Sequence, residues 1–389
     1  MKSTFYNEDD TKRKLCDFIM HASQLSMGPK CLEFEKKFSE YQERKYSVMF
    51  NSGSSAKLAL MQSLKNLGWL KDNDPVGFSA VTWSTNLMPL IQMNYKPIPI
   101  DISLETLNVS SKNLEDILKK TGLKALFLTN LLGFCSDIDK IAQICHDNNI
   151  LLLEDNCESL GSTLKNRKLG NYGIASTFSF FVGHHLSTIE GGMVVTDNNE
   201  LNDMLKMVRA HGWSRNLSED KKERLRKSNN IDAFYDQYTF HTLGYNLRPM
   251  EINGFIGLEQ LKFIEEINRI RNENFLEFYS VASKNKDINT LEFSHMSFVS
   301  NFAYPLVFKD KKLFEKYKKL FADANIEIRP IVGGAMTEQP FYKSNINDNL
   351  SEMSCPNAKT VHNNGFYFPN NPELTLEEKD TIKKLLLKK

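Results

Sequence analysis

The sequence predicts an α/β protein with a mostly parallel, doubly wound sheet and a smaller C-terminal α+β domain. From residue 76 onward, short apolar runs alternate with segments of helical periodicity, which is typical of a parallel sheet covered by helices. Polar or aromatic residues follow several of these runs, and in such sheets ligands bind beyond the carboxyl ends of the strands. A chain of 389 residues, 41% of them hydrophobic, is long enough for two domains.

The first part of the chain predicts two helices and then a strand that leads into a third helix. Helical periodicity covers residues 11–22 and 30–45, and in the second segment Leu32, Phe38 and Tyr41 are spaced to share a face. Residues 46–50 form a short apolar strand, and residues 57–67 again have helical periodicity.

A turn of small residues, Asn51-Ser-Gly-Ser-Ser-Ala56, joins this strand to the helix. Such a turn offers hydroxyls and backbone N–H groups at the positive end of the helix dipole. It therefore predicts an anion site, with an ordinary helix cap as the alternative that the residues themselves leave open.

The alternating region follows. Its expected strands are residues 76–81, 95–100, 123–129 and 150–153. Its expected helices are residues 84–93, 113–120 and 138–148. Trp83, Asn130 and Asp155 come directly after three of the strands, so we expect them at the edge where ligands bind. A buried core tryptophan and a helix-capping aspartate are the alternatives for Trp83 and Asp155.

The second half of the chain predicts a change of domain near residue 250. Residues 217–230 are almost wholly polar and indicate a solvated loop or an exposed helix. A long helix over residues 251–284 is expected to lead from a large domain (1–250) into a small one (251–389). In the small domain we expect strands at 298–308 and 326–332, a helix at 311–325, and a closing helix at 374–389.

Composition excludes several classes of protein. A net charge of +1 gives no electrostatic reason for nucleic-acid or membrane partners. No apolar segment approaches membrane-spanning length, and the N-terminus does not resemble a signal peptide. The six cysteines are scattered without metal-binding spacing, which favours reduced thiols in a cytoplasmic protein and no metal site.

One loop carries the most informative pattern, Ser179-Phe-Phe-Val-Gly-His-His-Leu-Ser-Thr-Ile-Glu-Gly-Gly192. It lies between two strand-like runs, 174–181 and 193–196, and connections of this kind often hold catalytic groups. It resembles the lysine loop of the DegT/DnrJ/EryC1/StrS sugar aminotransferase family, Ser-Phe-x-x-x-Lys-x-Ile/Leu-Thr-Thr-Gly-Glu-Gly-Gly. In that family the lysine holds pyridoxal phosphate as a Schiff base.

Aligned without a gap, His184 occupies the position of that lysine. No lysine occurs between Lys168 and Lys206, so no lysine at a neighbouring position can take the place of the cofactor-binding one. An imidazole cannot form the stable imine that a primary amine forms, but it does move protons near neutral pH.

The resemblance implies the aspartate-aminotransferase-like fold of type I pyridoxal phosphate enzymes and a cofactor, pyridoxal or pyridoxamine phosphate, held without a covalent bond. Asp155, in Glu-Asp-Asn-Cys-Glu, matches the residue that pairs with the ring nitrogen. Trp83 matches the one that stacks on the ring, and Glu158 is expected to reach the same pocket. The expected contacts to the cofactor phosphate are Gly53, Ser54, Ser55 and Ser179.

The resemblance also implies a homodimer with shared sites. Asn246 and Arg248 match the family's Gly-Tyr-Asn-x-Arg, a segment that reaches into the neighbouring subunit's site. Arg329 matches an arginine near the substrate. His211 and Arg215 resemble residues that handle the glutamate half-reaction, with Arg215 as a carboxylate clamp.

Three outcomes are compatible with a histidine in the lysine position: a silent homologue, an unusual aminotransferase, or a dehydratase. The family's sugar 3-dehydratases carry this histidine, and those acting on CDP-sugars also need an iron–sulfur cluster. Residues 209–216 contain no cysteine, so a cluster is not expected here. The resemblance is to the cluster-free kind, which implies a GDP-linked 4-keto-6-deoxyhexose, glutamate as amine donor, and ammonia as a product. His184 is then the expected proton carrier, and His185 a structural neighbour.

Overall fold

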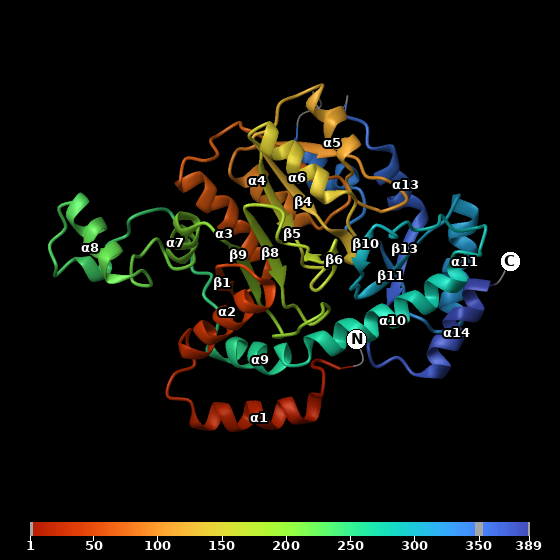
Figure 1. Ribbon diagram of the computed structural model, residues 1–389, viewed down its shortest axis with the longest axis horizontal. Coiled ribbons are helices and arrows are strands. Elements are labelled where there is room, and N and C mark those ends of the chain that lie inside the picture. Colours follow the sequence, from red (N-terminus) through yellow and green to blue (C-terminus); the bar gives the residue numbers. More distant parts are fainter. Residues whose placement is uncertain (1–2, 347–352, 388–389) are drawn as a thin grey trace.

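A computed structural model describes residues 3–346 and 353–387. Its centre is a seven-stranded sheet in the order β1-β9-β8-β5-β4-β2-β3 (Figure 1). The strands are β1 (Tyr46–Phe50), β2 (Pro75–Ser79), β3 (Lys96–Ile100), β4 (Ala125–Thr129), β5 (Leu151–Asp155), β8 (Ala175–Ser179) and β9 (Gly192–Thr196). All neighbours pair in parallel except β9, which is antiparallel to β8 and β1. The predicted mostly parallel sheet is confirmed.

Helices cover both faces of this sheet because its strands are apolar on both sides. In β4, Ala125 and Phe127 join the core beneath α3, whereas Leu126 and Leu128 join the core beneath α6, as the two-residue repeat of a strand requires. The helices of this part are α1 (Glu8–His21), α2 (Pro29–Gln42), α3 (Gly53–Asn66), α4 (Met88–Gln92), α5 (Ser111–Leu118), α6 (Ile138–Asp147) and α7 (Asn199–Val208).

The expected long helix over 251–284 is in fact two helices, α9 (Glu251–Leu261) and α10 (Ile264–Ala282). The two residues between them, Lys262 and Phe263, form a turn, in which Phe263 has φ −104° and ψ 0°. Helical periodicity continues across the break, so the sequence pattern did not reveal it. α9 packs on α2, and α10 packs on α14 (Leu376–Leu387) (Figure 1).

The C-terminal segment also differs in its strands. The single strand expected at 298–308 is divided into β10 (Met296–Phe298) and β11 (Ala303–Val307). β10 pairs with the short strand β6 (Thr163–Leu164), which in turn pairs with β7 (Arg167–Lys168), whereas β11 belongs to the sheet β11-β13-β12. Only β12 (Arg329–Pro330) is strand within the expected 326–332, and it pairs with β13 (Gly365–Pro369).

The remaining helices of this segment are α11 (Lys311–Asp323), α12 (Pro340–Asn345) and α13 (Pro356–Asn364). The last two residues of the expected closing helix, 388–389, lie outside the described residues. Because β10 pairs with a strand of the first half of the chain, the division at residue 250 stays a prediction.

The polar segment 217–230 forms an exposed helix, α8 (Glu219–Ser228), in which no residue is buried. Together with the residues up to 250 it projects away from the body, at the left of Figure 1. We call residues 213–250 the arm. Within the part of the chain that is described, no helix is both long and apolar enough to cross a bilayer.

Candidate active site

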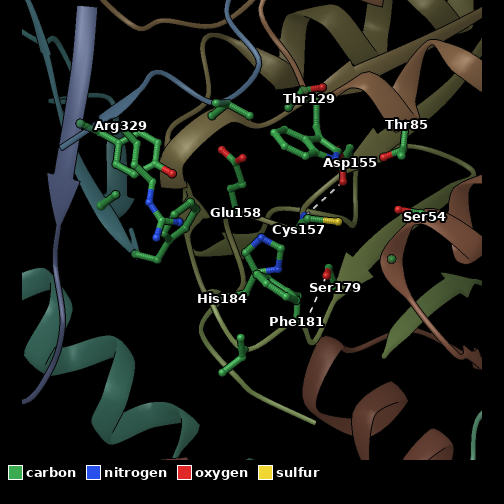
Figure 2. A pocket seen from close by; sticks show the side chains of 18 of the residues that line it. Ser54, Thr85, Thr129, Asp155, Cys157, Glu158, Ser179, Phe181, His184 and Arg329 are labelled. Carbon is green, nitrogen blue, oxygen red and sulfur yellow. Dashed lines mark hydrogen bonds between the residues drawn. The ribbon is translucent and has the colours of Figure 1, made fainter. Parts of the chain in front are cut away.

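A cavity of about 470 Å³ opens beyond the carboxyl ends of β4, β5 and β8 (Figure 2). Its wall combines the start of α3, the loop between β8 and β9, and residues of the C-terminal segment. The predicted site residues that line it are Gly53, Ser54, Trp83, Asp155, Glu158, Ser179, His184 and Arg329. The structure therefore brings together residues that lie up to 276 positions apart, from 53 to 329.

The N-terminus of α3 forms one end of the cavity. Ser52 caps the helix by accepting a hydrogen bond from the backbone N–H of Ser55 at 3.0 Å, which leaves other first-turn N–H groups without an intrahelical acceptor. Gly53 lets Ser179 approach, because a Cβ at Gly53 would lie only 2.6 Å from the Cβ of Ser179. Ser55 serves the cap and is not part of the cavity wall.

Asp155 lies at the end of β5 and is 3% exposed. Its Oδ1 accepts hydrogen bonds from the backbone N–H of Cys157 and from the hydroxyl of Thr177, both at 3.2 Å. Its Oδ2 accepts from Asn86 Nδ2 at 2.8 Å. The carboxylate is thus ionised and rigidly held, and its pKa lies below the usual value, although burial alone would raise it, because of the Lys57 charge and these donors.

Lys57 is the residue that sequence reasoning missed. It lies on α3, and its Nζ is 2.8 Å from Asp155 Oδ2 in an ion pair whose side chains are 3% and 4% exposed. Nothing near Lys57 in the sequence marks it as buried, because its counter-charge is on a strand almost a hundred residues later. A lysine within a run of small and apolar residues, Ala56 to Leu60, was the only available signal.

The loop that carries His184 is held by its own backbone and by α9. Phe180 N–H donates to Gly191 O at 2.9 Å, and Thr188 N–H donates to Phe180 O at 2.8 Å. The side chain of Asn253 donates to the carbonyls of Thr188 and Glu190.

Ile189, where the lysine-loop pattern has glycine, has a φ of 70°. This backbone region is unfavourable for a β-branched residue, so the surrounding structure must impose the conformation.

The imidazole of His184 points into the cavity between Glu158 and Ser179 (Figure 2). It meets the Phe302 ring edge to face at 5.5 Å, and its Nδ1 is buried without a hydrogen-bond partner among the described residues. Burial, with the nearby Lys57 charge, lowers the pKa of His184 to about 4. The imidazole is therefore neutral at physiological pH and has a free nitrogen.

Glu158 has the opposite tendency. It is 8% exposed, it accepts a hydrogen bond from Leu132 N–H at 2.9 Å, and burial raises its pKa to about 8. It is therefore mostly protonated at neutral pH. A neutral base and a protonated acid facing one cavity are the arrangement that acid–base chemistry needs.

Trp83 and Arg329 complete the predicted wall. Trp83 is 51% exposed, so it is not the core residue that the alternative interpretation allowed. Arg329 lies at β12 and pairs with Glu327 at 2.6 Å. Its guanidinium is largely exposed on the side of the cavity opposite Asp155 (Figure 2).

Other predicted residues lie outside the cavity of the single chain. His211 lies just before the arm. Its backbone N–H donates a hydrogen bond to Tyr245 O at 2.7 Å, and its ring centroid lies 5.0 Å from that of Trp213. The guanidinium of Arg215 stacks 4.3 Å from that indole. Asn246 and Arg248 lie further along the arm and are not part of the wall. His185 is buried beside Phe302, with neither ring nitrogen bonded among the described residues.

Sequence reasoning also missed several residues that the C-terminal segment contributes to the wall. They are Arg271, Phe302, Glu327, Tyr367 and Asn371. They come from α10, from β13 and from residues next to short strands, and no motif marks them. The six cysteines are unpaired thiols, and the described residues contain no group of three or more His, Cys, Asp or Glu side chains placed to hold a metal ion.

Comparison with known proteins decides the family. Residues 7–386 match the DegT/DnrJ/EryC1/StrS aminotransferase family. The chain belongs to this family. Within it, the chain is 39% identical over 332 residues to the GDP-4-keto-6-deoxy-D-mannose 3-dehydratase of Yersinia pseudotuberculosis, covering 84% of this chain and 83% of the relative.

Two solved structures of family members are similar over nearly the whole length. One is a histidine-to-asparagine variant of GDP-4-keto-6-deoxymannose-3-dehydratase with bound GDP-perosamine (31% identity, TM-score 0.89, 99% of each chain). The other is the same kind of enzyme with a trapped PLP-glutamate geminal diamine (30% identity, TM-score 0.85, 99% of this chain and 98% of that one). The fold expected from the lysine-loop resemblance is confirmed.

Proposed function

We propose that this chain is a pyridoxal phosphate-dependent 3-dehydratase that removes the C3 hydroxyl of a nucleotide-linked 4-keto-6-deoxyhexose. GDP-4-keto-6-deoxymannose is the proposed substrate, glutamate the amine donor, and ammonia and a 4-keto-3,6-dideoxy sugar the products. The observation that carries the proposal is the neutral imidazole of His184 in the cavity, at the loop position where the family pattern has its cofactor-binding lysine. The similarity to the two 3-dehydratase structures supports it.

The residues of the cavity fit the cofactor. The start of α3, with Gly53, Ser54 and the adjacent Ser179, suits a phosphate, because unpaired N–H groups and hydroxyls converge there. Asp155 offers a buried carboxylate to a ring nitrogen, and Trp83 offers a half-exposed aromatic wall. Pyridoxal phosphate supplies an aldehyde that exchanges amines and a ring that accepts electrons.

His184 is the group that moves protons. With cofactor and substrate bound, the imidazole of His184 would take up a proton from the carbon next to the cofactor ring and, once protonated, would donate it to the departing C3 hydroxyl. A low pKa makes the imidazolium a strong donor, which a poor leaving group such as hydroxide requires. Since imidazole forms no stable imine, His184 also leaves the cofactor unattached.

The C-terminal segment and the arm supply the substrate contacts in this proposal. Arg329 faces the entrance and suits an anionic part of a substrate. Arg215 and His211 are proposed to handle glutamate, and Asn246 and Arg248 to reach a neighbouring subunit. Because these four residues lie outside the cavity of their own chain, the proposal requires a second copy.

A homodimer with shared active sites supplies that copy. The arm exposes large apolar side chains that one chain leaves uncovered: Phe234 (79%), Tyr235 (66%), Tyr238 (71%), Phe240 (57%) and Leu243 (73%). A concentration of such residues marks an interaction surface. We further propose that the reaction serves colitose and O-antigen biosynthesis in the cytoplasm.

The test is turnover with glutamate, pyridoxal phosphate and a 4-keto-6-deoxy nucleotide sugar, assaying ammonia and 2-oxoglutarate. We expect both products to form continuously and in equal amounts. Formation of 2-oxoglutarate without ammonia would instead identify an aminotransferase, and the absence of both would identify a silent homologue. Comparing GDP-, CDP- and dTDP-linked substrates then tests the nucleotide.

A further inference from the structure

Lys57 places a positive charge beside Asp155, the carboxylate that the proposed function assigns to the ring nitrogen of the cofactor. Its ammonium lies 2.8 Å from Asp155 Oδ2, and both side chains are almost completely buried. Among the described residues, the one other hydrogen-bond partner of the ammonium is Thr85 Oγ1, at 3.5 Å. Lys57, Thr85 and Asp155 all belong to the cavity wall, so the ion pair is part of the site.

The Asp155 carboxylate has no free acceptor position. A carboxylate offers about four lone-pair directions, and four donors already occupy them: the Cys157 N–H and the Thr177 hydroxyl on Oδ1, and Asn86 Nδ2 and Lys57 Nζ on Oδ2. An additional donor must share with, or displace, one of the four.

Lys57 is the donor best able to yield. The Cys157 donor is backbone, and Asn86 Nδ2 is also held by Thr129 Oγ1 at 2.8 Å. Lys57, in contrast, approaches on a long side chain, and its second acceptor within the described part of the chain, Thr85 Oγ1, lies as far as 3.5 Å away. It is also the only charged donor of the four.

We propose that Lys57 is a positioning residue that competes with the ring nitrogen of pyridoxal phosphate for Asp155. This inference rests on the proposed function, in which Asp155 pairs with that nitrogen. When the cofactor is absent, Lys57 keeps the buried carboxylate ionised and in place. When it is bound, two cations share one carboxylate.

The consequence is a lower pKa of the cofactor's ring nitrogen. A like charge within about 4–6 Å disfavours a second positive charge, typically by about 1–3 pKa units. Glu158 and Cys157 add no compensating negative charge near neutral pH, because burial raises the pKa of both groups. Lys57 therefore weakens the ring as an electron acceptor and loosens the hold of the site on an already untethered cofactor.

The test is ¹⁵N NMR of ring-labelled pyridoxal phosphate bound to the full chain, titrated with pH. Lys57→Met keeps the side-chain length and removes the charge, so the midpoint for the ring nitrogen should rise by about 1–3 units relative to the wild type. Lys57→Gln leaves a neutral donor for Asp155 and should shift it in the same direction, which covers the case in which Lys57→Met does not fold.

Two controls keep the outcomes separate. Lys65→Met removes a charge from the same helix at a residue that pairs with Asp72 outside the cavity, and should leave the midpoint unchanged. Asp155→Asn should lower it. If Asp155→Asn has its effect and both Lys57 variants match the wild type, the inference about Lys57 is wrong and the proposed function stands. If Asp155→Asn has no effect, the proposed ring contact is wrong and the inference falls with it.

Discussion

At the scale of single residues, His184 and Glu158 show how one cavity prepares two groups for opposite tasks. Glu158 is buried and His184 half-buried in the same cavity wall (Figure 2), and burial disfavours the charged form of each. For the histidine this lowers the pKa to about 4, and for the glutamate it raises the pKa to about 8. The site therefore contains a free base and a protonated acid beside the ion pair of Lys57 and Asp155.

The raised pKa of Glu158 predicts a pH dependence of stability. The folded-state value, about 8, lies above the reference value of 4.5, so the unfolded chain loses this proton at lower pH. The stability that this group contributes is complete below about pH 4.5. It is lost as the pH rises to about 8, by an amount on the order of 5 kcal/mol. Glu158→Gln should therefore stabilise the protein at about pH 8 and change little at about pH 5.

Urea denaturation at both pH values measures this difference. Glu190→Gln, which changes an exposed glutamate of the same cavity wall, is the matched control and should leave the pH dependence as in the wild type. Equal effects of Glu158→Gln at the two pH values would show that Glu158 is ionised in the folded protein.

Several site residues could be predicted because each follows a pattern that has a local physical reason. Asp155 ends an apolar strand, and Gly53 and Ser54 open a helix after a strand. Lys57 could not be predicted, since a lysine is buried only when a counter-charge elsewhere in the fold neutralises it. The local sequence of α3 contains no information about Asp155.

At the scale of elements, sequence periodicity predicted most helices and strands of the central sheet, but it did not predict the breaks between α9 and α10 or between β10 and β11. The strands of the central sheet were expected within one or two residues at most ends, because their apolar runs are continuous. In α2 one member of the expected face was wrong: Leu32 is 54% exposed, whereas Phe38, also expected on that face, is buried together with Phe34. Spacing alone could not tell which of two overlapping apolar stripes meets α9.

The arm carries a prediction about assembly. Replacing Phe234 and Leu243, which are 79% and 73% exposed, with aspartate should convert a dimer into a chain of 44.7 kDa and should abolish turnover, because charges in an apolar interface are costly. Sedimentation velocity measures the mass. Met20→Asp, an equally exposed position on α1, is the control and should remain dimeric. A wild-type monomer, or a dimeric and active double variant, would contradict shared active sites.

At the scale of the whole molecule, the cavity exists only because distant segments meet. The sheet supplies Asp155 and Ser179, α3 supplies the phosphate end, and α10 with β11 and β13 supplies the opposite wall. The sequence predicted the half that belongs to the doubly wound sheet, where topology fixes the position of strand ends. The other half depends on how the C-terminal segment docks, and short strands such as β12 give no local signal.

The central claim is that the cofactor is held without a covalent bond and that His184 moves protons where a lysine would form an imine. Borohydride reduction of the protein with bound pyridoxal phosphate, followed by peptide mapping by mass spectrometry, tests it most directly. We expect no adduct in the wild type. In His184→Lys we expect an adduct at position 184 and loss of ammonia release. An adduct on wild-type Lys57, the only lysine among the described residues of the cavity wall, or undiminished dehydration by His184→Lys, would contradict it.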